Sequence, residues 1–326
     1  MTNTHQPSHA IVTRNLTKRY GSVEALTQLN LTIDTNSIYG FLGPNGAGKT
    51  TAIRLLMGSI RPTAGSATIL GHDTWHDGVA ARRDLGYLVP PDSLFPDFSG
   101  RSLLDFAAQL SGRAPVRRSR VLEALELSET ALDRRLGTYS RGMRQKLALT
   151  AAMQHDPALL ILDEPTESLD PLVQRAFEEL LRECRANGQT IFMSSHDLAE
   201  VERICERVAV VRGGHLVAEE MIEMLKGHYR RSGEIVFRGP TPPGLCQIAN
   251  VTLIRRHENR AEVSIDGDVG PLLQFLAGQE VADLLLPPPC LEDVFMQFYD
   301  TTPQSDIEAT ASDDSLAVPM TNRTPC

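Results

Sequence analysis

Apolar and polar positions recur with two periods along the first 225 residues, and each period predicts one kind of element. Uninterrupted apolar runs predict buried strands at 38–42, 85–89, 158–162 and 190–195. Apolar positions three and four residues apart predict helices at 50–60, 102–136, 144–154, 171–187 and 198–205. Strands that alternate with helices in this way are typical of an α/β protein with a parallel sheet.

Other stretches show strand patterns without intervening helices. Alternating apolar residues between 11 and 35 predict two or three antiparallel strands, residues 66–70 predict one more, and residues 208–218 predict a hairpin. These strands complete a first domain, 9–225, in which the helical stretch of about 97–140 forms a subdomain.

The pattern changes after residue 225. Strands at 234–237, 251–255, 261–265 and 281–286, with helices at 271–278 and 291–299, predict a small α+β domain over 226–300. Residues 301–326 are rich in Thr, Ser, Pro, Asp and Glu and carry almost no core residues, so we expect a disordered tail.

Composition narrows the class of protein. The chain has 326 residues and a net charge of −9, which argues against a general nucleic-acid binder. No apolar run approaches the roughly 20 residues that span a bilayer, and the polar N-terminus has no signal-peptide core. We therefore expect a cytosolic chain, or one that a partner holds at a membrane. Five scattered cysteines favour neither a disulfide framework nor a zinc site.

A glycine-rich loop follows the strand at 38–42 and precedes the helix at 50–60, which is the context of a phosphate-binding P-loop. Its glycines let backbone N–H groups approach phosphate oxygens, and the helix N-terminus adds a partial positive charge. Lys49 is expected to bind the β- and γ-phosphates, and Thr50 to ligate Mg²⁺. The loop residues are Gly43, Pro44, Asn45, Gly46, Ala47, Gly48, Lys49, Thr50 and Thr51.

Two carboxylates and a histidine follow neighbouring predicted strands. Asp163 and Glu164 end the strand at 158–162, where ligands of an open α/β sheet gather. Asp163 suits Mg²⁺, and Glu164 can polarise an attacking water. His196, at the tip of the next strand, could contact the γ-phosphate or that water, although a lone histidine is more often structural. With the P-loop, this set specifies a nucleoside triphosphatase.

The full set of motifs resembles the ATP-binding subunit of ABC transporters over residues 11 to about 225. The motifs are the P-loop, the signature at 139–145, the strand and carboxylates at 159–165, the D-loop at 168–171 and the switch histidine at 194–197. The segment 291–295 resembles the C-terminal segment of ATPases paired with ABC-2 type exporters, including drug and antibiotic exporters.

The resemblance implies a P-loop NTPase fold: a RecA-like core, an antiparallel β subdomain and an inserted helical subdomain, followed here by the small α+β domain. It implies an ATPase that uses ATP and Mg²⁺ and powers export through a separate ABC-2 type permease at the cytoplasmic face of the membrane. The permease is expected to dock on residues 97–140 and the loop at Pro90.

The resemblance also implies a head-to-tail homodimer, or a heterodimer with a related ATPase. Ser140, Arg141 and Gly142 would then face an ATP molecule held by the partner's P-loop, and Asp170 would lie across the interface. The resemblance favours adenine stacking for Tyr20, which spacing alone could equally assign to the core.

The chain departs from the family pattern at three positions. Pro90 stands where a glutamine is usual and lacks a side-chain oxygen, for which Asp92 could substitute. Arg141 and Ser168 each replace a common glycine, and Arg141 would either contact the γ-phosphate or point to solvent. Because Lys49, Asp163, Glu164 and His196 are all present, we predict active hydrolysis.

Two other classes stay open at this point. A soluble ABC ATPase that acts on ribosomes or DNA is disfavoured by the single ATPase domain and the acidic balance. A non-catalytic regulator would explain Pro90 and Arg141 but not the intact lysine and glutamate. The arginines at 113, 117, 118 and 120 are expected on a solvated helix face, or less often on a surface for an acidic partner.

Overall fold

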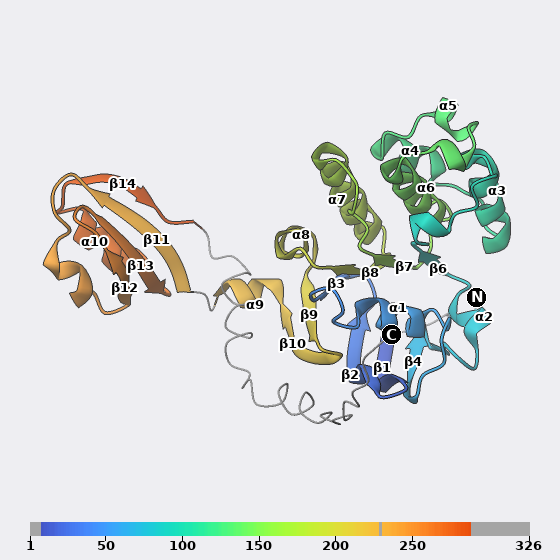
Figure 1. Ribbon diagram of the computed structural model, residues 1–326, viewed down its shortest axis with the longest axis horizontal. Coiled ribbons are helices and arrows are strands. Elements are labelled where there is room, and N and C mark those ends of the chain that lie inside the picture. The colour runs from blue at the N-terminus through green and yellow to red at the C-terminus, as the bar shows by residue number, and fades with distance from the viewer. Residues whose placement is uncertain (1–7, 228–229, 288–326) are drawn as a thin grey trace, which may run out of the picture.

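The computed structural model describes residues 8–227 and 230–287. Figure 1 shows two sheets together with most of the helices on one side and a third sheet apart from them. The first sheet is antiparallel, in the order β2-β1-β4-β5. Its strands are β1 (His9–Tyr20), β2 (Val23–Asp34), β4 (Ala64–Ile69) and β5 (His72–Asp73).

The central sheet has the order β10-β9-β3-β8-β7-β6 and is parallel except for its edge strand β10. Alternate residues of its strand β3 enter different cores, because side chains of a strand point to opposite faces. Tyr39 and Phe41 pack with the first sheet, and Ile38 and Leu42 pack on the other face. The strands are β3 (Ile38–Leu42), β6 (Leu85–Tyr87), β7 (Leu159–Asp163), β8 (Thr190–Ser195), β9 (Arg207–Arg212) and β10 (His215–Met221).

The two faces of the central sheet carry different helices (Figure 1). One face packs against α1 (Lys49–Leu56) and the first sheet. The other packs against α6 (Arg141–Met153), α7 (Pro171–Ala186) and α8 (Leu198–Ile204). The α/β architecture is as predicted, but α1 ends before Ile60, because Gly58 adopts a left-handed conformation with φ +62°.

The pattern over 102–136 predicted one helical stretch, but the structure divides it into shorter helices. These helices are α3 (Gly100–Ser111), α4 (Arg118–Ala124) and α5 (Glu129–Leu132), with a 3₁₀ turn at Leu136–Thr138. Gly112, at φ +63°, ends α3, and the Ser128 hydroxyl caps α5. The sequence pattern also missed α2 (Gly78–Ala81), β5 and a 3₁₀ turn at Pro91–Ser93.

The predicted solvated arginine face is wrong for Arg117. Only 8% of Arg117 is exposed, and its Nη2 lies 2.6 Å from Glu183 Oε1 on α7. Its Nη1 donates to Gln189 Oε1 at 2.9 Å. This arginine therefore joins the helical stretch to the central core.

The third sheet is antiparallel, in the order β12-β13-β11-β14, and has its own apolar core with α10 (Gly270–Leu276). Its strands are β11 (Arg230–Phe237), β12 (Val251–Arg256), β13 (Arg260–Asp266) and β14 (Val281–Leu285), with a 3₁₀ turn at Pro243–Gln247. The predicted boundary at residue 225 falls within α9 (Ile222–Gly227). The predicted helix 291–299 and tail 301–326 lie outside the described residues, and the division into domains stays a prediction.

None of the helices described is both long and apolar enough to span a bilayer.

Candidate active site

The glycine-rich loop joins the end of β3 to the start of α1, as predicted. Gly46 and Gly48 adopt positive φ angles of 81° and 105°, which residues other than glycine rarely adopt. A Cβ atom at Gly48 would also lie only 2.6 Å from the Ala25 carbonyl oxygen. The loop is thus closely packed against β2.

An open cleft of about 350 Å³ lies over this loop. Strand β2, the hairpin between β9 and β10 and the carboxylate after β7 all contribute to it. The lining residues are Val23, Glu24, Ala25, Pro44, Asn45, Gly46, Gly48, Lys49, Thr50, Thr51, Glu164, Gly213 and Gly214. The backbone N–H groups at the start of α1 make this cleft suited to an anion.

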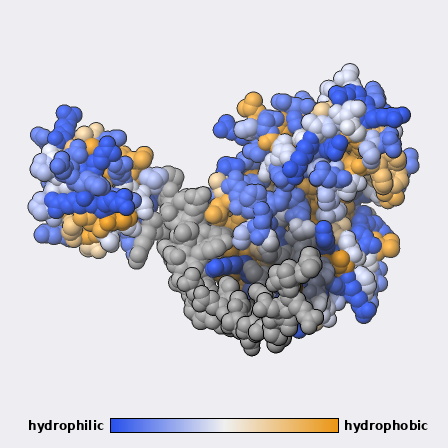
Figure 2. Space-filling model, in the orientation of Figure 1, coloured by the Kyte–Doolittle hydropathy of each residue, from blue (hydrophilic) through white to orange (hydrophobic). Residues whose placement is uncertain are grey.

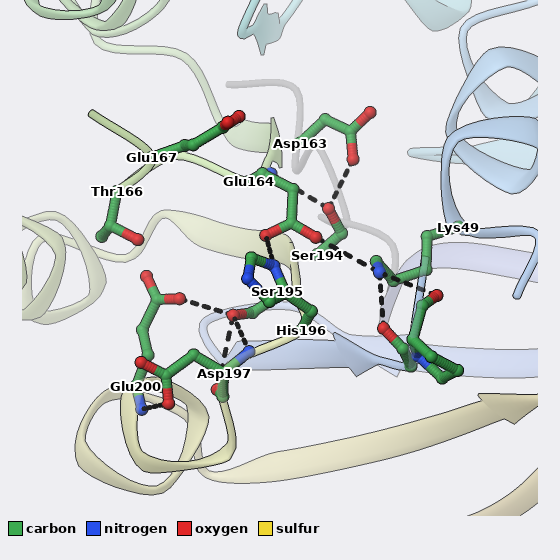
Figure 3. A network of polar contacts seen from close by, with 12 residues as sticks. Lys49, Asp163, Glu164, Thr166, Glu167, Ser194, Ser195, His196, Asp197 and Glu200 are labelled. Carbon is green, nitrogen blue, oxygen red and sulfur yellow. Dashed lines mark hydrogen bonds and ion pairs between the residues drawn. The ribbon is translucent and has the colours of Figure 1, made fainter. Parts of the chain in front are cut away.

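Lys49 is buried beneath the loop. Its Nζ donates to the carbonyl oxygens of Gly43, at 2.5 Å, and Pro44, at 3.3 Å. It also lies 3.2 Å from Glu164 Oε1, an ion pair without the geometry of a hydrogen bond (Figure 3). The loop therefore holds its positive charge at the base of the cleft.

Thr50 and Asp163 are brought together although 113 residues separate them. The Thr50 hydroxyl donates to Asp163 Oδ2 at 3.1 Å, and the Ser194 hydroxyl donates to Asp163 Oδ1 at 2.5 Å. A hydroxyl and a carboxylate are oxygen donors of the kind that Mg²⁺ prefers, so these residues fit the metal predicted from the sequence.

Glu164 and His196 also meet. His196 Nδ1 lies 2.8 Å from Glu164 Oε2, and the Glu164 N–H donates to the Ser194 hydroxyl at 3.0 Å (Figure 3). Glu164 has a φ of +48°, a left-handed conformation uncommon outside glycine. This backbone turns the carboxylate out of the line of β7 and toward the cleft, which it helps to line.

Comparison with known proteins agrees with this geometry. The profile of the family described as ABC transporter matches residues 26–167. The Nod factor export ATP-binding protein I of Burkholderia orbicola is 34% identical over 293 residues, covering 87% of this chain and 95% of that protein. The chain belongs to the ATP-binding proteins of ABC transporters. Its function as an ATP-binding ABC ATPase, predicted from the motifs, is confirmed.

Other relatives lead to the same family. The bacitracin transport ATP-binding protein BcrA of Bacillus licheniformis is 36% identical, covering 69% of this chain and 74% of that protein. A solved ATP-binding subunit of an ABC transporter superposes with a TM-score of 0.62 at 28% identity, covering 67% of this chain and 92% of its own. The names of the Burkholderia and Bacillus relatives agree with the predicted resemblance to export ATPases. The solved structure confirms the P-loop NTPase fold.

The ABC signature lies outside the cleft of the same chain. Ser140 caps α6 by accepting from the Met143 N–H at 3.2 Å, so α6 begins at Arg141 rather than at Arg144 as predicted. Asp170 caps α7 by accepting from the Val173 N–H at 3.1 Å, a bond that lowers the pKa of its carboxyl. Among the described residues, the signature and Asp170 do not line the cleft.

The Arg141 side chain is 58% exposed, which agrees with the predicted orientation toward solvent. Its Nη2 also lies 2.9 Å from Glu167 Oε1, in the loop that follows Asp163 and Glu164. Beside it, a Cβ atom on Gly142 would lie 2.8 Å from the Ser168 carbonyl oxygen. Gln145, buried in α6, donates to the Pro165 carbonyl oxygen at 2.7 Å. The signature helix is thus closely tied to the loop that carries Glu164.

Three other predicted positions do not reach the cleft. Tyr20 is 46% exposed at the end of β1 and has Lys18 Nζ 5.0 Å from its ring centroid. Asp92 lies in the exposed 3₁₀ turn after β6, and Pro90 directly precedes that turn. Neither residue lines the cleft.

Sequence reasoning missed the cleft contributions of β2 and of the hairpin at Gly213 and Gly214. The sequence predicts a hairpin over 208–218, but nothing in that pattern indicates that its two glycines line a cleft.

Proposed function

We propose that this chain powers export of a substrate through a separate ABC-2 type permease, at the cytoplasmic face of a membrane. The names of the export and transport relatives support this proposal. The observation that carries it is the contact network of Lys49, Glu164 and His196 at the cleft, beside the Thr50–Asp163 pair.

In this proposal each residue of the network has one role in ATP hydrolysis. Lys49 and the loop N–H groups bind the phosphates, and each charge-assisted bond contributes about 1.5–3 kcal/mol. Thr50 and Asp163 hold Mg²⁺, which when bound neutralises charge on the phosphates. Glu164 accepts the proton of the attacking water, a contribution of about 10²–10⁴ in rate. His196 holds the Glu164 carboxylate in place through Nδ1.

The second half of the ATP site is proposed to come from another subunit, in a homodimer or a heterodimer with a related ATPase. The first turn of α6 presents Ser140, Arg141 and Gly142 away from the cleft of their own chain. Such a helix start favours an anion. A head-to-tail dimer places it against the partner's nucleotide, with Asp170 at the interface and Tyr20 moving onto the adenine.

The permease is proposed to dock in a groove of about 570 Å³ between α2, β6 and α3. Val79 and Leu110 are its most exposed apolar residues, and His155 lies at its base. Phe95, Phe98 and Phe106 form an exposed ring cluster nearby, with adjacent centroids 5.4 and 6.3 Å apart. Figure 2 shows apolar surface at this end of the molecule, and such patches are typical of interfaces. The groove extends the predicted surface, 97–140, to α2 and β6.

Purified protein with Mg²⁺ and ATP tests the catalytic roles. We expect Lys49→Ala to abolish ATP binding, and Glu164→Gln to bind ATP but lower kcat by about 10²–10⁴-fold, the share that a general base supplies. The Glu164→Gln subunit should also form dimers on ATP in size-exclusion chromatography. Turnover near the wild-type rate in either variant refutes the assigned roles. Glu178→Gln, which removes a buried carboxylate on α7 away from the cleft, is the matched control.

A further inference from the structure

Glu200 is a buried carboxylate close to the active site that the roles above do not use. It lies in α8 and is only 3% exposed. The Ser195 hydroxyl donates to Glu200 Oε2 at 2.5 Å. Figure 3 shows the other carboxylate oxygen directed toward Thr166. That oxygen makes no hydrogen bond within the described residues, although the Thr166 hydroxyl contributes to lowering the pKa of the carboxyl.

The two carboxylate oxygens of Glu200 are directed toward the two segments that carry His196 and Glu164. Ser195 directly precedes His196 at the end of β8 and also accepts from the Asp197 N–H at 3.0 Å. Thr166 lies two residues after Glu164. Glu200 therefore contacts the segment that carries His196, and His196 in turn lies 2.8 Å from Glu164.

The burial of Glu200 is costly for the folded chain. Burial, Asp197 and Glu164 all raise the pKa of its carboxyl, and the groups that counter this are hydroxyls rather than a cation. A buried carboxylate held in this way adds less stability than an apolar side chain of the same volume would. What the carboxylate does provide is a fixed acceptor for the Ser195 hydroxyl, with its second oxygen directed toward Thr166.

We propose that Glu200 is a positioning residue for ATP hydrolysis: it holds Ser195, and with it the neighbouring His196, so that His196 and Glu164 meet at the distance hydrolysis requires. The proposal rests on the catalytic roles given to these two residues under the proposed function. Displacements of about 1 Å in a catalytic group can cost about 10²-fold in rate, so a loop support of this kind has a large effect.

Three variants of the full-length protein test the proposal: Glu200→Ala, Glu200→Gln and, as matched control, Glu178→Gln. Glu178 is also a buried helical carboxylate, but its partners are Arg182 and Arg203. We expect Glu200→Ala to lower kcat at least tenfold with KM for ATP changed less than twofold, and Glu200→Gln to lose less. The Glu178→Gln control should have the kcat of the wild type when it is assayed at temperatures at which it is folded.

Two further measurements separate positioning from simple destabilisation. Since Glu200 acts through His196, Glu200→Ala should cause little additional loss of kcat in a His196→Ala background. Ser195→Ala should reproduce the loss, and Ser195→Thr, which keeps the hydroxyl, should restore activity. The Ser195 pair and Glu200→Gln decide the question if Glu200→Ala does not fold.

Some outcomes overturn the proposal. Wild-type kcat in the Glu200 variants does so, as does a loss that multiplies fully with that of His196→Ala, because an independent effect would be additive in free energy. If Glu164→Gln and His196→Ala both keep turnover, the proposed function fails instead. If those two variants are inactive and the Glu200 variants are not, only this inference fails.

Discussion

Replacing Gly142 with alanine perturbs the contact between the signature helix and the loop after the catalytic carboxylates. The added Cβ atom would lie 2.8 Å from the Ser168 carbonyl oxygen, and ordinary contacts begin at 3.4 Å. The loop must therefore retreat by about 0.6 Å, at an overpacking cost of about 1–3 kcal/mol. Since Ser168 is itself at φ +66°, the loop is held in an uncommon conformation and has little freedom to adapt.

The expected result is a loss of activity in protein that is still folded, so that destabilisation alone does not account for it. A shift of this size in the segment between Glu164 and Asp170 should lower kcat at least tenfold, because catalytic rates are sensitive to displacements of about 1 Å. The melting temperature should fall by about 2–12 °C, since each kcal/mol lowers it by about 2–4 °C in a domain of this size. Steady-state ATPase rates and calorimetry measure the two quantities.

A second glycine in the same helical region is the control for this substitution. A Cβ atom at Gly137 would lie 3.4 Å from its nearest neighbour, the Pro96 carbonyl oxygen, so Gly137→Ala should leave kcat within about twofold. If Gly142→Ala keeps the kcat of the wild type, the close approach of the two backbones has no role in catalysis and the reasoning is refuted.

Two further predictions concern stability. Arg117→Met should lower the free energy of unfolding by about 2–4 kcal/mol in denaturant titrations, because breaking a buried pair costs about 3–5 kcal/mol and Glu183 is partly solvated; a change below 1 kcal/mol would contradict a link between helical stretch and core. Burial lowers the pKa of His155, so stability should fall as pH drops below 6.5, where the unfolded chain takes up the proton first. His155→Gln should flatten this dependence below pH 6.5, whereas His215→Gln, at an exposed position, should not.

The sequence alone was enough to predict the elements whose signals are local. The glycine-rich loop, the strand before it and the helix after it each follow from a few adjacent residues, and the structure has all three. The ends of β7 and β8 were also predictable, because a buried apolar run stops where Asp163 and His196 begin. Asp163 and His196 could be placed because each directly follows a predicted strand in the sequence.

Contacts between distant segments could not be predicted in the same way. Arg117 looked like one of several exposed arginines, and only folding brings Glu183, 66 residues later, against it. The burial of Glu200 likewise depends on how α8 packs beneath two loops. The helix pattern over 102–136 ran through turns that depend on packing and capping, so the breaks between α3, α4 and α5 were missed.

The ion pair between Lys49 and Glu164 has a consequence for the subunit at rest. While the two side chains are paired, Lys49 Nζ lies 3.2 Å from one oxygen of the Glu164 carboxylate and engages it at the base of the cleft. An arriving triphosphate competes for the lysine with several negative charges and releases the carboxylate. On the roles proposed above, ATP binding therefore frees the same carboxylate that accepts the proton of the attacking water.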